Sequence, residues 1–195
     1  MAMTPDQDRE RSEKIRIILD QEVQDGKDLA DDARKMAAFL LRERKEYLPG
    51  DVQQQVRFEV LLGAEQVFST IDFLVSLNGR PAMIIKCAAG SLSSRERQAV
   101  AAARVFSSPP PPVAVVADPL TAVVLNTADG KTIGEGFGAI PIRSQLLEIL
   151  AASPAAPFSP ERIEKEKRIL LAFDAIQCHV PQGGDGGVTI GEPET

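Results

Sequence analysis

The order of apolar and polar residues along the chain predicts a central sheet with helices around it. Largely apolar runs, which are typical of buried strands, cover 71–77, 80–87, 113–116 and 122–125. A more polar run over 55–68 predicts a first strand, in which Gly63 is expected to form a bulge or a bend. Apolar residues at helical spacing predict helices over 6–24, 31–44, about 94–106, 144–151 and 160–176. We therefore expect an α/β (α+β) fold with a mixed sheet of about five to six strands, flanked by helices and extended by helices at both ends.

Turn signals fix how several of these strands connect. Asn78-Gly79 lies between two apolar runs and is the strongest short hairpin signal, because both central residues of a type I′ turn need positive φ. Asp129-Gly130 is expected to turn the strand at 122–125 back into Thr132-Ile133. The run at 113–116 is apolar at every position, so it is expected to form a central, fully buried strand.

Length and composition favour one domain with appendages. The 195 residues divide into a helical extension over 1–30, an α/β domain over 31–152, an amphipathic helix over 153–180 and a glycine-rich tail over 181–195. The polar composition of the tail predicts disorder. No apolar run approaches the roughly 20 residues that a membrane span needs, and two cysteines make no disulfide framework. We expect a cytoplasmic protein without membrane contact.

Two charges interrupt the apolar strands on either side of the Asn78-Gly79 turn. Asp72 stands near the start of the first strand, and Lys86 stands near the end of the second. A hairpin between them would bring the two side chains within a few ångströms of each other, as cross-strand neighbours. One interpretation is a simple ion pair at the edge of the sheet. The other is the remnant of a chemical site.

The region around these two charges resembles a known family. It is similar to the N-terminal nuclease-type domain of type I restriction enzyme R subunits, in the free-standing form found in bacteria. The resemblance covers roughly residues 33–150, and its matching pieces read ARKMAAFLLRERKEYLPGDV, IDFLV, NGRPAMIIKC, AAGSLSSRERQ, VAVVAD, LNTADGKTIGEG and AIPIR. It implies a restriction-endonuclease-like fold and, in active members, DNA cleavage that depends on Mg²⁺.

The resemblance also implies a site, which this chain lacks in part. Active members carry an Asp on the second strand and a Glu-x-Lys on the third, because carboxylate oxygens hold the cation and the lysine steadies charge. Asp72 matches the Asp, and Lys86 matches the lysine if Ile84 stands in place of the Glu. In a second alignment Lys86 takes the position of the Glu and Ala88 that of the lysine. Both alignments lack the second carboxylate, for which Glu59 or Glu65 could substitute.

Three functions follow from these residues. The leading hypothesis is a nuclease-fold domain with a degenerate site and no cofactor, which acts in DNA binding or complex assembly. The expected phosphate contacts come from Lys86, Arg95, Arg97 and Arg104. A net charge of −6 predicts that such binding is weak and depends strongly on salt.

The second hypothesis is an active metal-dependent DNA endonuclease, in which Asp72 and a migrated carboxylate such as Glu59 hold Mg²⁺. The third is a protein-interaction module without a nucleic-acid role, which forms a homodimer through the first or the C-terminal helix. A bound metal ion, a salt-dependent DNA affinity and a stable dimer would distinguish the three.

Overall fold

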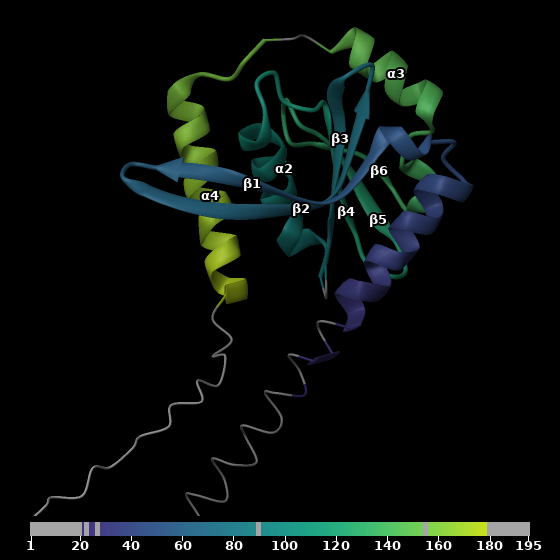
Figure 1. The fold of residues 1–195 in the computed structure, drawn as a ribbon, viewed down its shortest axis with the longest axis horizontal. Helices are drawn as coiled ribbons and strands as arrows, with labels where there is room; N and C mark the ends of the chain where they lie inside the picture. The colour runs from purple at the N-terminus through teal and green to yellow at the C-terminus, as the bar shows by residue number, and fades with distance from the viewer. Residues whose placement is uncertain (1–20, 22–23, 26–27, 89–90, 154–155, 179–195) are drawn as a thin grey trace, which may run out of the picture.

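The structure, a computed structural model, describes residues 21, 24–25, 28–88, 91–153 and 156–178. A helix over 28–43 opens the fold, and six strands form one sheet in the order β1-β2-β3-β4-β5-β6 (Figure 1). The strands are β1 (Val52–Leu62), β2 (Glu65–Leu77), β3 (Arg80–Cys87), β4 (Val113–Ala117), β5 (Ala122–Asn126) and β6 (Thr132–Glu135). The other helices are α2 (Ser93–Phe106), α3 (Arg143–Ala152) and α4 (Pro160–Cys178), with short 3₁₀ turns η1 (Pro49–Asp51) and η2 (Phe137–Ala139).

The predicted fold class is confirmed: the sheet is mixed and helices cover it. Only β3 and β4 run parallel, because α2 crosses over between them, and all other neighbours are antiparallel. Alternate residues of each strand face opposite sides of the sheet, so Ile85 and Ile84 belong to different cores. The expected central strand is also confirmed, since every residue of β4 is buried between β3 and β5.

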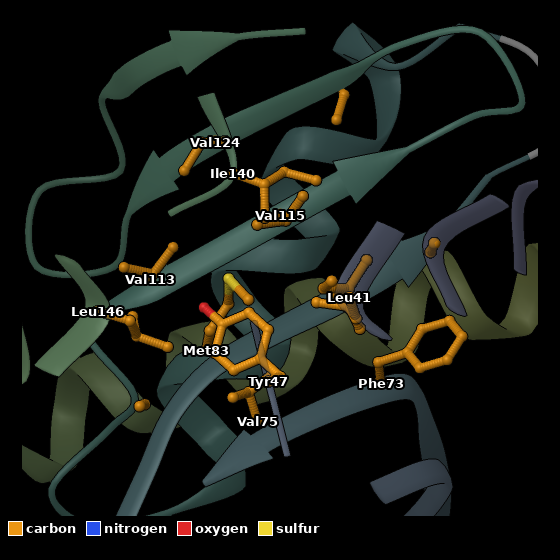
Figure 2. Packing of buried hydrophobic residues seen from close by; sticks show 14 of the residues in the cluster. Leu41, Tyr47, Phe73, Val75, Met83, Val113, Val115, Val124, Ile140 and Leu146 are labelled. Atoms are coloured by element: carbon orange, nitrogen blue, oxygen red, sulfur yellow. The ribbon is translucent and has the colours of Figure 1, made fainter. Parts of the chain in front are cut away.

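Each face of the sheet carries its own apolar core. On one face Phe73, Met83 and Val115 pack against Leu41 of the helix over 28–43 and Leu146 of α3 (Figure 2). On the other face the alanines of α2 lie directly on β3 and β4, and α4 packs outside them through Leu170. The C-terminal helix, predicted as an appendage, is therefore part of the packed fold.

The hairpin turns of β1–β2 and β2–β3 each contain a glycine with positive φ, and the first of them was not predicted. Asn78 and Gly79 have φ of 52° and 75°, which confirms the type I′ turn predicted between β2 and β3. The predicted continuous strand over 55–68 is wrong, because the chain reverses at Gly63 and Ala64 and forms two strands there. Gly63 has a φ of 62° at the first position of a two-residue loop, where glycine favours a type II′ turn over a bulge.

Some predictions lie outside the described residues. These are the helix expected over 6–24, of which the structure describes only residues 21 and 24, and the tail over 181–195. Within the described ranges, none of the helices combines the length and the apolar character that crossing a membrane requires.

Candidate functional site

The candidate site lies where β2 turns away from β3. The β2–β3 ladder ends with the pair of Phe73 and Ile85, while β2 continues beyond this point paired with β1. This two-stranded extension, residues 55–72 of β1 and β2 with their loop, leans over α4 and is called the arm below (Figure 1). Asp72 is the first residue of β2 beyond the ladder, so it stands at the fork between the arm and the main sheet.

Asp72 takes the place of a missing ladder acceptor. The backbone N–H of Cys87 donates to Asp72 Oδ2 at 2.8 Å. If the β2–β3 ladder continued, a backbone carbonyl of β2 would accept there instead. An unpaired N–H buried at this position would cost stability, so the carboxylate has a structural task at the fork.

The second oxygen of Asp72 is also occupied. Arg34 Nη1, from the helix over 28–43, lies 3.3 Å from Asp72 Oδ1, and Gln55 Nε2 lies 3.3 Å from the same atom. Asp72 is only 8% exposed. Burial alone would lower the pKa of Arg34, but hydrogen bonds to Asp31 and Asp72 outweigh it and raise that pKa. The positive charge beside Asp72 is therefore the guanidinium of Arg34, which stays protonated.

Lys86 does not form the expected ion pair with Asp72. Its Nζ donates instead to the backbone carbonyl of Thr70 at 2.8 Å, and the described part of the chain has no ion pair between the two. The reason is the fork: β2 has already left β3 at Asp72, and the carboxylate turns toward the Cys87 N–H. The interpretation as a cross-strand ion pair is therefore wrong, and Arg34 is the partner.

Neither alignment of the motif has its full set of polar residues, because Ile84 stands at the Glu position in the first, and Lys86 and Ala88 stand at the Glu and lysine positions in the second. Ile84 is 0% exposed and pairs with Leu74, and Ala88 is 6% exposed. Both belong to the core that faces α2. Neither alignment of the restriction-enzyme motif therefore brings a second oxygen ligand to Asp72.

The substitute carboxylates lie far from Asp72. The register of β1 and β2 places Gln55 opposite Asp72, and Glu59 is four residues further along β1. At about 3.3 Å per residue this is ~13 Å along the strand, and Glu65, at the start of β2, is ~23 Å from Asp72. A single metal ion cannot bridge such distances. Among the described residues, no group of three His, Cys, Asp or Glu side chains is placed to hold a metal ion.

Two of the three arginines of α2 that were expected to bind phosphate, Arg97 and Arg104, face a carboxylate of α4, that of Glu166. Arg104 is 5% exposed and donates from Nε to the carbonyl of Thr127 at 2.7 Å, from Nη1 to Glu166 Oε1 at 2.7 Å and from Nη2 to the carbonyl of Ala128 at 3.1 Å. Arg97 Nη2 lies 2.6 Å from Glu166 Oε2, in an ion pair without hydrogen-bond geometry. Burial lowers the pKa of Arg104, and the bonds to Glu166 oppose that change.

These contacts reduce the surface that a phosphate could reach. Arg104 is 5% exposed and donates three hydrogen bonds within the protein, so it reaches the surface only where it lines the hollow beside the first turns of α2. The hollow beside the first turns of α2 holds about 310 Å³, and its lining includes the carboxylates of Glu96 and Asp129 as well as Arg97. Arg95 remains half-buried and donates to Gln98 at 3.4 Å. Of the four basic residues that were expected to contact DNA phosphates, Lys86, Arg95 and the exposed part of Arg97 remain accessible to a polyanion.

Sequence reasoning missed three residues that complete these clusters. Arg34 and Gln55 fill the space around Asp72, and Glu166 neutralises two arginines. The sequence offered one signal, namely that Arg34 directly follows Ala33 in the helix predicted over 31–44. Comparison with protein-family models, with curated proteins and with solved structures finds no match to the chain. The geometry of these clusters therefore carries the functional argument.

Proposed function

We propose that the chain is a nuclease-like domain that does not cleave DNA and acts by binding within a larger assembly. The order of elements supports the nuclease-like part of the proposal. A helix over 28–43, the antiparallel strands β1 to β3, the crossover helix α2 and the parallel strand β4 follow one another as the restriction-enzyme resemblance leads us to expect.

The occupancy of Asp72 supports the loss of cleavage. Magnesium requires several oxygen ligands in a nearly octahedral arrangement. Asp72 offers one carboxylate, whose oxygens already accept from the Cys87 N–H, Arg34 and Gln55. A divalent cation would have to displace the guanidinium of Arg34 or lie beside it against charge repulsion. The hydrogen bonds of Asp72 instead link three parts of the fold: the helix over 28–43, the arm and the end of β3.

Binding to a protein partner is favoured over binding to DNA. Arg104 is buried, Arg97 is shared with Glu166, and the whole chain carries a charge of −6. A polyanion is repelled by most of such a surface. DNA contact through Arg95, Arg97 and Lys86 remains a second proposal, limited to weak binding without sequence preference, because phosphate contacts carry no base information.

A cleavage assay tests this proposal. Duplex and branched DNA are incubated with Mg²⁺ or Mn²⁺ and the wild-type chain, with Asp72→Ala as the site variant. We expect no cleavage from either protein, and no heat of Mn²⁺ binding in calorimetry of the wild type. Asp118→Ala, at the turn between β4 and β5, is a matched control for contaminating nuclease. Cleavage by the wild type that disappears with Asp72→Ala and persists with Asp118→Ala would refute the proposal.

A further inference from the structure

The outer edge of β1 has no neighbour in the sheet. β1 stands at one end of the strand order, and Figure 1 shows no further strand beside the arm. The loop that follows Leu62 has two residues, so Leu62 and Glu65 form a hydrogen-bonded pair, and such pairs occur at every second residue of an antiparallel ladder. The backbone groups of Arg57, Glu59 and Leu61 therefore point away from β2, and none of the hydrogen bonds among the described residues reaches them.

This edge is long and weakly protected against pairing. Natural edge strands are often short, bulged, or supplied with lysine or proline, because unpaired backbone groups act as a template for another strand. β1 has 11 residues and contains neither lysine nor proline. Gln55, with a φ of 51°, interrupts it only at the fork. The stretch 56–62 therefore offers an extended segment a continuous row of donors and acceptors.

Two charges on this edge have no ion-pair partner among the described residues. Arg57 and Glu59 are exposed and lie on either side of Phe58, whose side chain faces α2. The guanidinium carbon of Arg57 lies 3.9 Å from the ring centre of Phe68, and Glu59 accepts a hydrogen bond from Gln66. Both of these contacts are with neutral groups, so neither charge is neutralised. A strand that pairs with this edge gains from an acidic residue opposite Arg57 and a basic residue opposite Glu59.

The inner side of the same edge borders a largely apolar hollow. Phe58 meets Phe106, the last residue of α2, edge to face, with 5.4 Å between the ring centres. Phe106 also lines a hollow of about 290 Å³, together with Phe158 and with Ile163 of α4. In Figure 1 the first half of α4 extends past the edge of β1, so an added strand would lie over it. The residue of that strand opposite Phe58 would face the hollow.

We propose that the edge of β1 binds an extended segment of a partner protein as an additional, antiparallel strand. Antiparallel pairing is the more stable arrangement per residue. Arg57 and Glu59 each exchange two backbone hydrogen bonds with the residue that faces them. Read from its N-terminus, the segment carries a basic residue opposite Glu59, an apolar residue opposite Phe58 and an acidic residue opposite Arg57. Main-chain bonds supply the affinity, while the two charges and the hollow supply the selectivity.

A second copy of the chain fits this edge poorly, although β1 itself has the required order of residues. A two-fold pair of β1 strands with these charge pairs would be centred on Phe58. The helix α4 contacts both strands of the arm, and its 19 residues make it about 28 Å long at 1.5 Å per residue. The α4 helix of each copy would lie behind the arm of the other, where α2 and α4 of that copy already pack. An extended segment without such a helix avoids the clash.

The segment names a partner for the assembly role proposed above and rests on it in that respect, but its test is separate. Cleavage of DNA by the chain would refute the proposed function and leave the edge site standing. A chain that neither cleaves DNA nor binds a peptide would refute the edge site alone.

Fluorescence anisotropy of the full chain with labelled synthetic peptides tests the edge. The peptide Thr-Val-Lys-Val-Glu-Val-Thr has the required order, and Thr-Val-Glu-Val-Lys-Val-Thr has the same composition with its charges exchanged. So short a segment buries less than the roughly 800 Å² per partner of a stable interface, so we expect a Kd on the order of 100 μM for the first peptide. The second should bind about tenfold more weakly, because both charge pairs become repulsive. Equal or reversed preference, or no binding at millimolar peptide, would overturn the proposal.

Methylation of the peptide backbone locates the hydrogen bonds. Methyl groups on the lysine and glutamate nitrogens of the first peptide remove the two N–H groups that face β1, and binding should fall about tenfold or more. A methyl group on the central valine nitrogen, whose N–H points to the other side, is the matched control and should change the Kd little. Equal losses in the two peptides would reject strand addition.

Charge reversal in the protein tests the register. Arg57→Glu/Glu59→Arg should reverse the preference between the two peptides, with unchanged circular dichroism. Glu65→Arg, at the start of β2 in the same arm, is the matched control and should keep the preference of the wild type. An unaltered preference in the double variant would refute the register. Without peptide, sedimentation should show a monomer, and a dimer that Arg57→Glu alone dissociates would assign the edge to a second copy and overturn the proposal.

Discussion

Removal of the Glu166 carboxylate is the most direct test of how α4 is held to the fold. Glu166 is 3% exposed and lies 2.6 to 2.7 Å from two guanidinium groups, those of Arg97 and Arg104. Glu166→Gln keeps the size of the side chain and removes its charge. Breaking a buried ion pair by removing one partner costs about 3–5 kcal/mol, because the remaining charge is buried without compensation. Arg104 keeps its acceptors at Thr127 and Ala128, so we expect a value near the lower limit, ~3 kcal/mol.

Urea unfolding followed by circular dichroism measures this free energy, and thermal unfolding gives an independent value. For a domain of this size ~3 kcal/mol corresponds to a fall in Tm of roughly 6–12 °C. Glu164→Gln, an exposed carboxylate on the same helix that pairs with Lys167, is the control and should change stability by less than ~0.5 kcal/mol. A Glu166→Gln loss no larger than that of the control would refute the reasoning.

Two further predictions concern the fork and the helix α2. Burial, followed by the nearby charge of Asp72, raises the pKa of Cys87, so in a Cys178→Ser background this thiol should stay protonated and react slowly with iodoacetamide at pH 8. Labelling there as fast as that of a small free thiol would contradict the packing at the end of β3. If the chain binds DNA, its affinity should fall with salt, and Arg95→Ala/Arg97→Ala should lower the slope of log K against log [salt] by at most about two. Arg104→Lys should leave that slope unchanged, because Arg104 is buried, and a reduced slope would place it on the DNA surface.

Local signals in the sequence predicted the sheet, because the residues that decide its strands are neighbours along the chain. The apolar run at β4 and the Asn78-Gly79 turn each act within a few residues, and both predictions are confirmed. The prediction at Gly63 was wrong because a bulge and a tight turn both favour a glycine with positive φ. The choice between them depends on whether the strand after Gly63 pairs back with the strand before it, and pairing is a property of the fold.

The partners of the charged residues could not be predicted in the same way. Asp72 meets Arg34 across 38 positions of sequence, and Arg104 meets Glu166 across 62. Each residue has an ordinary local context, and many other charges could have been its partner. Only the placement of helices on the sheet selects among them. The absence of the second carboxylate, by contrast, could be predicted from the sequence, because it depends only on the residue types of Ile84 and Lys86.

The arm depends on a part of the chain that is synthesised much later. Val60 of β1 is 0% exposed, and it shares a core with Phe58 beside it and Leu170 of α4, which follows about 110 residues further on. A ribosome therefore releases β1 and β2 well before the helix that covers them, and a long strand with an open apolar face is prone to wrong pairing. Until α4 arrives, the main sheet can form around β4 while the arm stays uncovered on one side. A chain cut before Pro160 would keep that exposed state, so aggregation of such a fragment would begin at the arm.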